Sequence, residues 1–373
     1  MDNLLKKVGI VTLDGMHNYG NRLQNYALEQ VLKQLGFDAV TLIFTESKSK
    51  DTWNRICKKL SKPKEILPMI IKKLTKKGVS EEYASFLKMR ELKTAAFSNF
   101  QNEYLNNIKI PENSDFSEFY KIIVGSDQVW NPTGSGFKIK NFLVFAPKEK
   151  RISYAASFGV TEIPNSLKKY YSRHLMGINE ISVREEAGVE IVKKLTGRKA
   201  ELVLDPTMLL KREFWKKLIP TEEYQDKSYI LVYTIRGYNE EKQEKLKEFA
   251  KNNAFEIIHI MGDFYDEEHR ILAPDEFLHA IRDAKMIFTD SFHCGIFSIM
   301  LHKPFVIFER NDGNMGSRLE TLLTKFDLIV NLYTPEMKFD DIMFNMDFNN
   351  VDIILKEGRN HGIKYLKRAL KVE

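Results

Sequence analysis

Short apolar runs alternate with helical patterns along this chain, and polar residues follow each run. Residues 8–13 form the first run. The polar turn DGMHNYGN follows, then a helical repeat over about 22–35 that ends at Gly36, and then a second apolar run at 38–44. This order of strand, loop, helix and strand predicts a right-handed crossover onto a parallel sheet. Further strands are predicted at 121–124, 152–157 and 178–183, which complete one Rossmann-like domain over residues 1–204.

The same alternation starts again in the second half of the chain. Its predicted strands are 229–234, 255–260, 286–289 and 305–308, and its predicted helices are 239–253, 275–284 and 293–301. We expect a second Rossmann-like domain over 205–350, joined near Asp205-Pro206, and a C-terminal helix over 351–373. The predicted fold class is therefore α/β, with two Rossmann-like domains facing a cleft in the arrangement called GT-B among sugar transferases. Parallel strands bind ligands at their carboxyl ends, so this cleft is the expected site.

A basic stretch interrupts the first series. The segment from about 45 to 113 fits neither domain and is expected to be a helical insertion. The segment from Lys48 to Lys77 contains eleven Lys or Arg and only two acidic residues, while the net charge of the whole chain is +6. The rest of the chain is therefore acidic, which disfavours nucleic acid as a partner. Apolar residues and lysines alternate with a helical rhythm over 56–74, although Pro63 and Pro68 interrupt it. A contact with the membrane surface and a merely solvated insertion both remain open.

Composition and missing motifs narrow the class of protein. The two cysteines, Cys57 and Cys294, form no CxxC pair, and no signal peptide or membrane-spanning run is found. We therefore expect a cytoplasmic protein, peripheral at the inner face of the membrane if the basic stretch binds there. The chain has no phosphate-loop motif, no intact GxGxxG after a strand and no Asp-x-Asp signature. We expect neither a metal nor a cofactor.

Polar residues follow two strands of the first domain. The turn HNYGN supplies Asn18, Tyr19 and Asn21, at a helix start where backbone N–H groups attract anions. A simple tight turn with Asn21 as the helix cap is the alternative. The run GSDQVWN follows the strand at 121–124, and its polar side chains and tryptophan suit hydrogen bonding and stacking on a sugar. Its candidates are Ser126, Asp127, Trp130 and Asn131. Capping and core packing are the alternatives for Asp127 and Trp130.

Candidate cations and a candidate acid lie further along the chain. Arg184 precedes Glu185-Glu186 at a helix start, where an ion pair with either acid would compete with ligand binding. His293 follows the strand at 286–289 and begins a helix, a position suited to general acid or base catalysis. Arg310 and Arg318 follow the next strand, and solvation at the surface is their alternative.

Six motifs give the chain a family resemblance. HNYGN, GSDQVWN, SYAASFG, SVREEAG, LDPTMLL and TDSFHCGIFSIMLHKPFVIF occur in this order, and the chain resembles the bacterial polysaccharide pyruvyl transferases. The resemblance implies transfer of the pyruvyl group of phosphoenolpyruvate to two hydroxyls of a sugar in a cell-surface polysaccharide precursor, giving a pyruvate ketal. The implied partners are therefore phosphoenolpyruvate, a substrate, and a sugar or lipid-linked oligosaccharide acceptor.

The resemblance also implies roles for particular residues. The family's S-x-R and Arg-Leu-His motifs match Arg184 and His293 as donor-binding residues. Ser291 stands where many members have the arginine of the second motif, so Arg318 or Arg310 is expected to replace that cation. A donor that must be protonated at carbon needs an acid, and His293 is the candidate, while Asp127 would hold the acceptor or take its proton. A GT-B glycosyltransferase using a nucleotide sugar and a noncatalytic glycan-binding relative are the alternatives.

Overall fold

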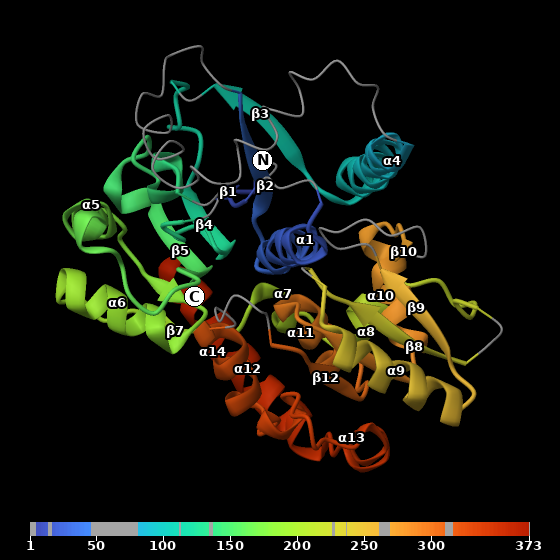
Figure 1. Ribbon diagram of the computed structural model, residues 1–373. Coiled ribbons are helices and arrows are strands. Elements are labelled where there is room, and N and C mark those ends of the chain that lie inside the picture. Colours follow the sequence, from blue (N-terminus) through green and yellow to red (C-terminus); the bar gives the residue numbers. More distant parts are fainter. Residues whose placement is uncertain are drawn as a thin grey trace, which may run out of the picture.

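The computed structural model describes residues 5–13, 17–45, 81–111, 113–133, 137–225, 228–235, 237–260, 269–309 and 316–372. These residues form two parallel sheets with helices packed on them (Figure 1). The predicted α/β class with two Rossmann-like units, a GT-B-like arrangement, is confirmed by these sheets.

The first sheet contains seven strands in the order β3-β2-β1-β4-β5-β6-β7. They are β1 (Lys7–Val11), β2 (Asp38–Thr45), β3 (Asn107–Pro111), β4 (Lys121–Asp127), β5 (Arg151–Ala156), β6 (Ser182–Val183) and β7 (Glu201–Leu202). Every residue of β4 is buried. A strand covered on both faces is typical of a parallel sheet enclosed by helices, and its polar end, Ser126-Asp127, is consequently buried as well.

The second sheet contains five strands in the order β10-β9-β8-β11-β12. They are β8 (Tyr229–Tyr233), β9 (Glu256–Ile260), β10 (His269–Arg270), β11 (Met286–Thr289) and β12 (Phe305–Ile307). All the recorded pairings are parallel, with β8 between β9 and β11. The carboxyl ends of β8 and β11 therefore lie side by side, and the helix after β11 begins at that edge.

Helices cover the faces of both sheets. Up to residue 216 they are α1 (Tyr19–Gln34), α4 (Glu81–Tyr104), α5 (Asn165–Leu175), α6 (Glu186–Thr196), α7 (Pro206–Leu209) and α8 (Arg212–Lys216). After residue 216 they are α9 (Glu240–Asn252), α10 (Pro274–Asp283), α11 (Phe292–Met300), α12 (Gly316–Lys325), α13 (Phe339–Asn345) and α14 (Asn349–Ala369). Short 3-10 helices span Ile139–Phe142, Lys148–Lys150 and Ile329–Asn331.

The expected helical insertion is only partly helical. Residues 46–80, which hold the whole basic stretch from Lys48 to Lys77, lie outside the described ranges. Helix α4 agrees with the expectation, but β3 pairs in parallel with β2 and becomes the edge strand of the first sheet. Its sequence NIKIP offers too short an alternation to mark a strand without the neighbouring β2.

The last helix, α14, connects the two units. It follows α13 of the second half and runs back to the first sheet, so that the C-terminal end lies beside β5 and β7 (Figure 1). The Tyr365 hydroxyl donates to the Ser153 carbonyl of β5 at 2.8 Å. Gly362 lies so close to that strand that a Cβ there would stand 2.6 Å from the Tyr154 hydroxyl. The helix is thus part of the first unit's core at its far end. Within the described ranges, no helix is long and apolar enough to cross a membrane.

Candidate functional site

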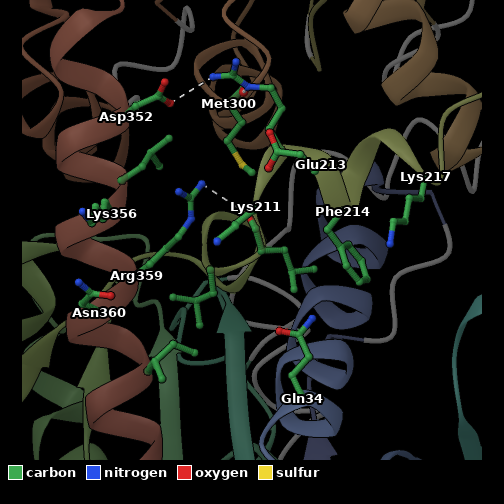
Figure 2. A pocket seen from close by; sticks show the side chains of 15 residues that line it. Gln34, Lys211, Glu213, Phe214, Lys217, Met300, Asp352, Lys356, Arg359 and Asn360 are labelled. Carbon is green, nitrogen blue, oxygen red and sulfur yellow. Dashed lines mark hydrogen bonds and ion pairs between the residues drawn. The ribbon is translucent and has the colours of Figure 1, made fainter.

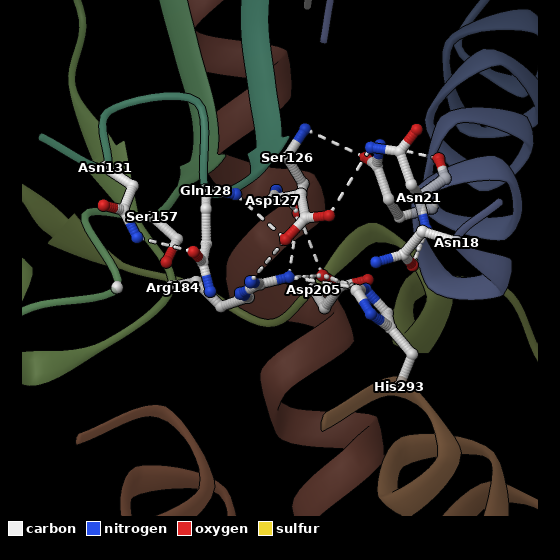
Figure 3. Close-up of polar contacts among 12 residues, drawn as sticks. Asn18, Asn21, Ser126, Asp127, Gln128, Asn131, Ser157, Arg184, Asp205 and His293 are labelled. Carbon is white, nitrogen blue, oxygen red and sulfur yellow. Dashed lines mark hydrogen bonds and ion pairs between the residues drawn. The ribbon is translucent and has the colours of Figure 1, made fainter. Parts of the chain in front are cut away.

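A cluster of buried polar side chains lies where helix α11 of the second unit approaches the strand ends of the first sheet (Figure 3). Ser126 and Asp127 end β4, Arg184 follows β6, and Asp205 follows β7. His293 reaches the same place from the second unit, on the first turn of α11. The cluster therefore lies at the carboxyl ends of parallel strands, where ligands of such sheets bind.

Arg184 lies at the centre of this cluster and has two carboxylate partners. Its Nη1 donates to Oδ2 of Asp205 at 2.6 Å, and its Nη2 donates to Oδ1 of Asp127 at 3.2 Å. Only 2% of the Arg184 side chain is exposed, so these are buried ion pairs. The alternative of an ion pair with Glu185 or Glu186 is wrong, because Glu185 instead accepts from the Ser157 hydroxyl and from backbone N–H groups.

Asp205, which the sequence analysis did not single out as a site residue, contacts three members of the cluster. Its Oδ2 accepts from the Ser126 hydroxyl at 2.9 Å and lies 3.5 Å from Nε2 of His293. Its Oδ1 caps helix α7 by accepting from the backbone and hydroxyl of Thr207. The sequence Asp205-Pro206-Thr207 is typical of a helix start. Such a pattern gives no sign that the second carboxylate oxygen of Asp205 also belongs to the site.

The ion pairs hold both aspartates in their charged form. Burial alone would raise the pKa of Asp205, but His293 and Arg184 outweigh it and hold the pKa well below its usual range. Burial also opposes the effect of Arg184, His293 and Arg318 on Asp127, and the balance lowers its pKa. Burial would lower the pKa of Arg184, yet Asp205 and Asp127 raise it overall. The cluster is therefore a set of fixed charges shielded from water.

His293 is enclosed between the two units. Its Nε2 lies 3.4 Å from Nη1 of Arg184, on the side of Asp205. On its other side the ring packs against Gly20 in the first turn of α1, where an added Cβ would stand 1.9 Å from Nδ1. Only a glycine permits this approach, so Gly20 and Asp205 together fix the position of the imidazole.

A second cation, Arg318, lies beside Arg184 and His293, on the ring of Phe292. The Phe292 ring is contacted by Arg184, with its guanidinium carbon 4.3 Å from the ring centroid, and by Arg318 of α12 at 5.7 Å. The Gln128 amide, with its oxygen facing Arg318, accepts from both terminal nitrogens of that guanidinium at 2.6 and 2.7 Å. Ser291 caps α11 by accepting from the Cys294 N–H at 3.5 Å. Arg310 lies outside the described residues.

The remaining acceptor-side candidates divide into those near the cluster and those in the core. Asn21 lies 3.5 Å from Oδ2 of Asp127, while Asn18 is exposed and caps α1. The Asn131 side-chain amide lies 2.6 Å from the Gln128 amide. Within this group, Asn21 and Asn131 thus border the cluster.

Two aromatic residues do not have the surface that sugar stacking requires. Trp130 is fully buried, donates to the Asn141 carbonyl at 2.9 Å and stacks on Phe142. Tyr19 stacks on Phe277 of α10 with ring centroids 4.3 Å apart, and so joins the two units. The prediction of an acceptor-stacking Trp130 is wrong, and Tyr19 is a packing residue, because in both cases other rings cover the aromatic faces.

These groups allow acid-base chemistry next to bound anions. An imidazole beside a carboxylate can donate or accept a proton, and two guanidinium groups with the first-turn N–H groups of α11 attract phosphate or carboxylate. Among the described residues, no group of three or more His, Cys, Asp or Glu is arranged to hold a metal ion.

Comparison with known proteins gives one family and several similar structures. A family model described as polysaccharide pyruvyl transferase matches residues 18–312. A comparison with curated protein sequences gives no match.

The similar solved structures share little sequence with the chain. S. aureus MnaA, solved with UDP, has 10% identity and a TM-score of 0.49, covering 99% of this chain and 98% of its own. A UDP-GlcNAc 2-epimerase from Methanocaldococcus jannaschii has 12% identity and a TM-score of 0.46, covering 92% of this chain and 93% of its own.

Proposed function

The chain belongs to the polysaccharide pyruvyl transferase family, and on that premise we propose that it transfers the pyruvyl group of phosphoenolpyruvate to two hydroxyls of a sugar. The acceptor is part of a cell-surface polysaccharide precursor, and the product is a pyruvate ketal. The observation that carries this proposal is the meeting of His293 with Asp205 and Arg184 at the strand ends of the first unit.

The charges near His293 suit a donor with two anionic groups. Phosphoenolpyruvate carries a phosphate and a carboxylate, and each needs a cation or oriented N–H groups. Arg318 and the first turn of α11 supply these on the second unit, and Arg184 supplies a cation that two carboxylates already hold in place. Arg318 lies next to Phe292, one residue from Ser291, so it takes the role of the cation missing there.

The proposed reaction uses His293 as the acid. His293 donates a proton to the methylene carbon of phosphoenolpyruvate, and the first sugar hydroxyl forms a C–O bond to the neighbouring carbon and gives its proton back through Asp127 or His293. The second hydroxyl then forms the other C–O bond as the C–O bond to phosphate breaks, and its proton leaves with the phosphate. One phosphate is released for each ketal formed. Asp127, lying between Arg184 and Asn21, holds the acceptor hydroxyls in this scheme.

Phosphate release tests the proposal against the use of a nucleotide sugar. The protein should release phosphate from phosphoenolpyruvate only when a suitable sugar acceptor is present, and it should do so in the presence of EDTA. Release of UDP from a UDP-sugar with the same acceptors, and no phosphate from phosphoenolpyruvate, would instead make the protein a glycosyltransferase. Turnover of neither donor with any acceptor would favour a noncatalytic relative.

A further inference from the structure

A pocket whose lining contains none of the residues of the catalytic cluster lies where both units meet α14 (Figure 2). Its volume is about 730 Å³. Residues 209–217 of the connecting segment form one wall and α14 forms the facing wall, while Gln34 of α1 and Met300 of α11 lie at its border. Residues of both units and of the segment between them therefore line one cavity, which has the size of a small-molecule site.

The charged residues of this pocket are mostly basic. Its lining includes Lys211, Arg212, Lys217, Lys356 and Arg359, against only two acids, Glu213 and Asp352. Asp352 is already paired, at 3.1 Å from Nη2 of Arg212 and 3.2 Å from Nε2 of His302. On α14 the positions 352, 356, 359 and 363 are spaced by three or four residues and thus share one face of the helix. The uncompensated charge of the pocket is positive.

Arg359 is held in place with part of its guanidinium still available. Its Nε donates to the Met208 carbonyl at 2.7 Å and its Nη2 donates to the Leu210 carbonyl at 3.5 Å. Burial, with a smaller contribution from Arg212, lowers the pKa of Arg359 despite Asp352 and Glu213 nearby. A desolvated guanidinium fixed by two carbonyls is an arrangement that a bound anion stabilises, because the anion replaces the hydration that burial removed.

Apolar side chains complete the lining. Phe214 and Ile363 are partly exposed and contribute carbon surface between the basic groups, while Leu209, Met300 and Leu355 of the lining are buried. A purely inorganic anion would leave this surface exposed to water, whereas a ligand with an apolar part would cover it.

The pocket lies at the far ends of the two helices that meet at His293. Helix α1 begins with Tyr19 and Gly20, against the imidazole, and ends at Gln34 in the pocket. Helix α11 begins beside His293 and ends at Met300, whose carbonyl accepts from Nε of Arg212 at 2.7 Å. A ligand here would contact both units at once.

We propose that this pocket binds a small phosphate-bearing molecule with an apolar body, separately from the catalytic cluster. The phosphate is recognised by Arg359, Lys356 and Lys211, and the apolar body is recognised by the surface around Phe214.

Isothermal titration with phenyl phosphate and inorganic phosphate tests the two parts of this recognition. We expect phenyl phosphate to bind the wild-type protein about tenfold more tightly than inorganic phosphate, because its ring covers the apolar lining. The double variant K211Q/K356Q should bind phenyl phosphate about tenfold or more weakly, since two charge-assisted contacts are lost. Both lysines are exposed, so the variant should fold normally.

A matched variant controls for net charge. K216Q/K364Q removes the same number of charges from exposed positions on α8 and α14, outside the pocket lining, and should bind like the wild type. Equal weakening in both double variants, or no binding to the wild type, would overturn the proposal. So would binding that is lost in Arg318→Gln and kept in K211Q/K356Q, because the ligand would then lie at the catalytic cluster.

Discussion

Asp205 connects the parts of the catalytic cluster at the scale of single residues. It accepts from Arg184 and Ser126, lies beside His293 and caps α7. A buried guanidinium between two carboxylates is stable only while both partners are present, because an unpaired buried charge is costly. Asp205 therefore acts on the reaction by positioning the arginine and the histidine.

Asp205→Asn removes one of the two charges that compensate Arg184. We expect the free energy of unfolding at pH 7 to fall by about 3 kcal/mol or more, since the variant keeps the volume of the side chain and loses its charge. Chemical denaturation of the native protein and the variant measures this difference. A difference under about 1 kcal/mol would show that Asp127 alone compensates the arginine.

The same pair of proteins gives a pH dependence with a definite sign. The folded-state pKa of Asp205 lies below its unfolded value, so its stabilisation is complete above about pH 4 and is lost as pH falls further. The difference in unfolding free energy between native protein and Asp205→Asn should thus narrow by up to about 1.4 kcal/mol for each pH unit below 4. A difference that stays constant from pH 7 to pH 3 would contradict the pKa assignment.

His293 is the residue on which proposed catalysis depends most. His293→Ala should lower turnover by roughly 100-fold or more, the usual effect of removing a general acid. The melting temperature should change little, because Arg184 keeps both of its carboxylate partners, Asp205 and Asp127, when the imidazole is removed. Near-normal turnover of the variant, measured as phosphate release, would show that His293 is a structural residue and not the acid of the reaction.

Single residues also show where sequence reasoning reaches its limit. The positions of Arg184, His293 and Asp127 at strand ends could be predicted, because strand and helix patterns place them there. Trp130 was misassigned because a polar run next to a strand end does not reveal that Phe142 and Phe158 cover its ring. Asp205 could not be singled out from the sequence, because an aspartate before a proline also fits a plain helix start.

At the scale of elements, the contact between α1 and α11 determines the position of the imidazole. Gly20 lies on α1 and His293 on α11, so the two helices must keep their separation for the ring to fit. Tyr19, one residue earlier, stacks on α10 and reinforces the same approach.

Gly20→Ala tests this contact with one methyl group. The new Cβ would stand 1.9 Å from Nδ1 of His293, so the ring must move, and we expect turnover to fall at least tenfold, because a reacting group displaced by about 1 Å loses its alignment. Gly295→Ala is the control, since a Cβ there meets its nearest neighbour at 3.4 Å and fits without displacement. Equal activities of the two variants, measured as phosphate release, would show that the approach of α1 does not position His293.

The order of strands and helices along the chain was largely predictable from the sequence. Which of these elements pair or pack with one another was not. The alternation of apolar runs and helical repeats predicts both parallel sheets. A strand that is buried on both faces consists of consecutive apolar residues, so it can be recognised as an apolar run in the sequence. The edge strand β3 and the return of α14 to the first unit depend on contacts with Phe44 and Ser153, residues far away in the sequence. Such contacts leave no local pattern.

At the scale of the whole molecule, one cluster and one pocket link the two units. The cluster lies at the carboxyl ends of the strands of the first sheet, and α14 crosses between the units on its way to that sheet. The basic stretch over 48–77, which lies outside the described residues, adds a charge asymmetry to the sequence.

We propose that this basic stretch contacts the inner face of the membrane, where lipid-linked acceptors would be presented. Clustered lysines gain about 1 kcal/mol each near anionic lipid. The native protein should therefore float with liposomes containing anionic lipid at low salt. A variant with Lys58, Lys59, Lys72, Lys73, Lys76 and Lys77 changed to Gln should not. Equal flotation of both, or binding by neither, would leave the stretch as a solvated insertion.

The central claim is that the pyruvyl carbons of phosphoenolpyruvate pass to a sugar at the cluster around His293. Incubation with carbon-labelled phosphoenolpyruvate and candidate acceptors, followed by mass spectrometry, tests it most directly. The account predicts an acceptor heavier by one labelled pyruvic acid less one water, formed together with one phosphate and greatly reduced in His293→Ala. Label that stays in phosphoenolpyruvate or free pyruvate, while a UDP-sugar donor modifies the same acceptor, would contradict it.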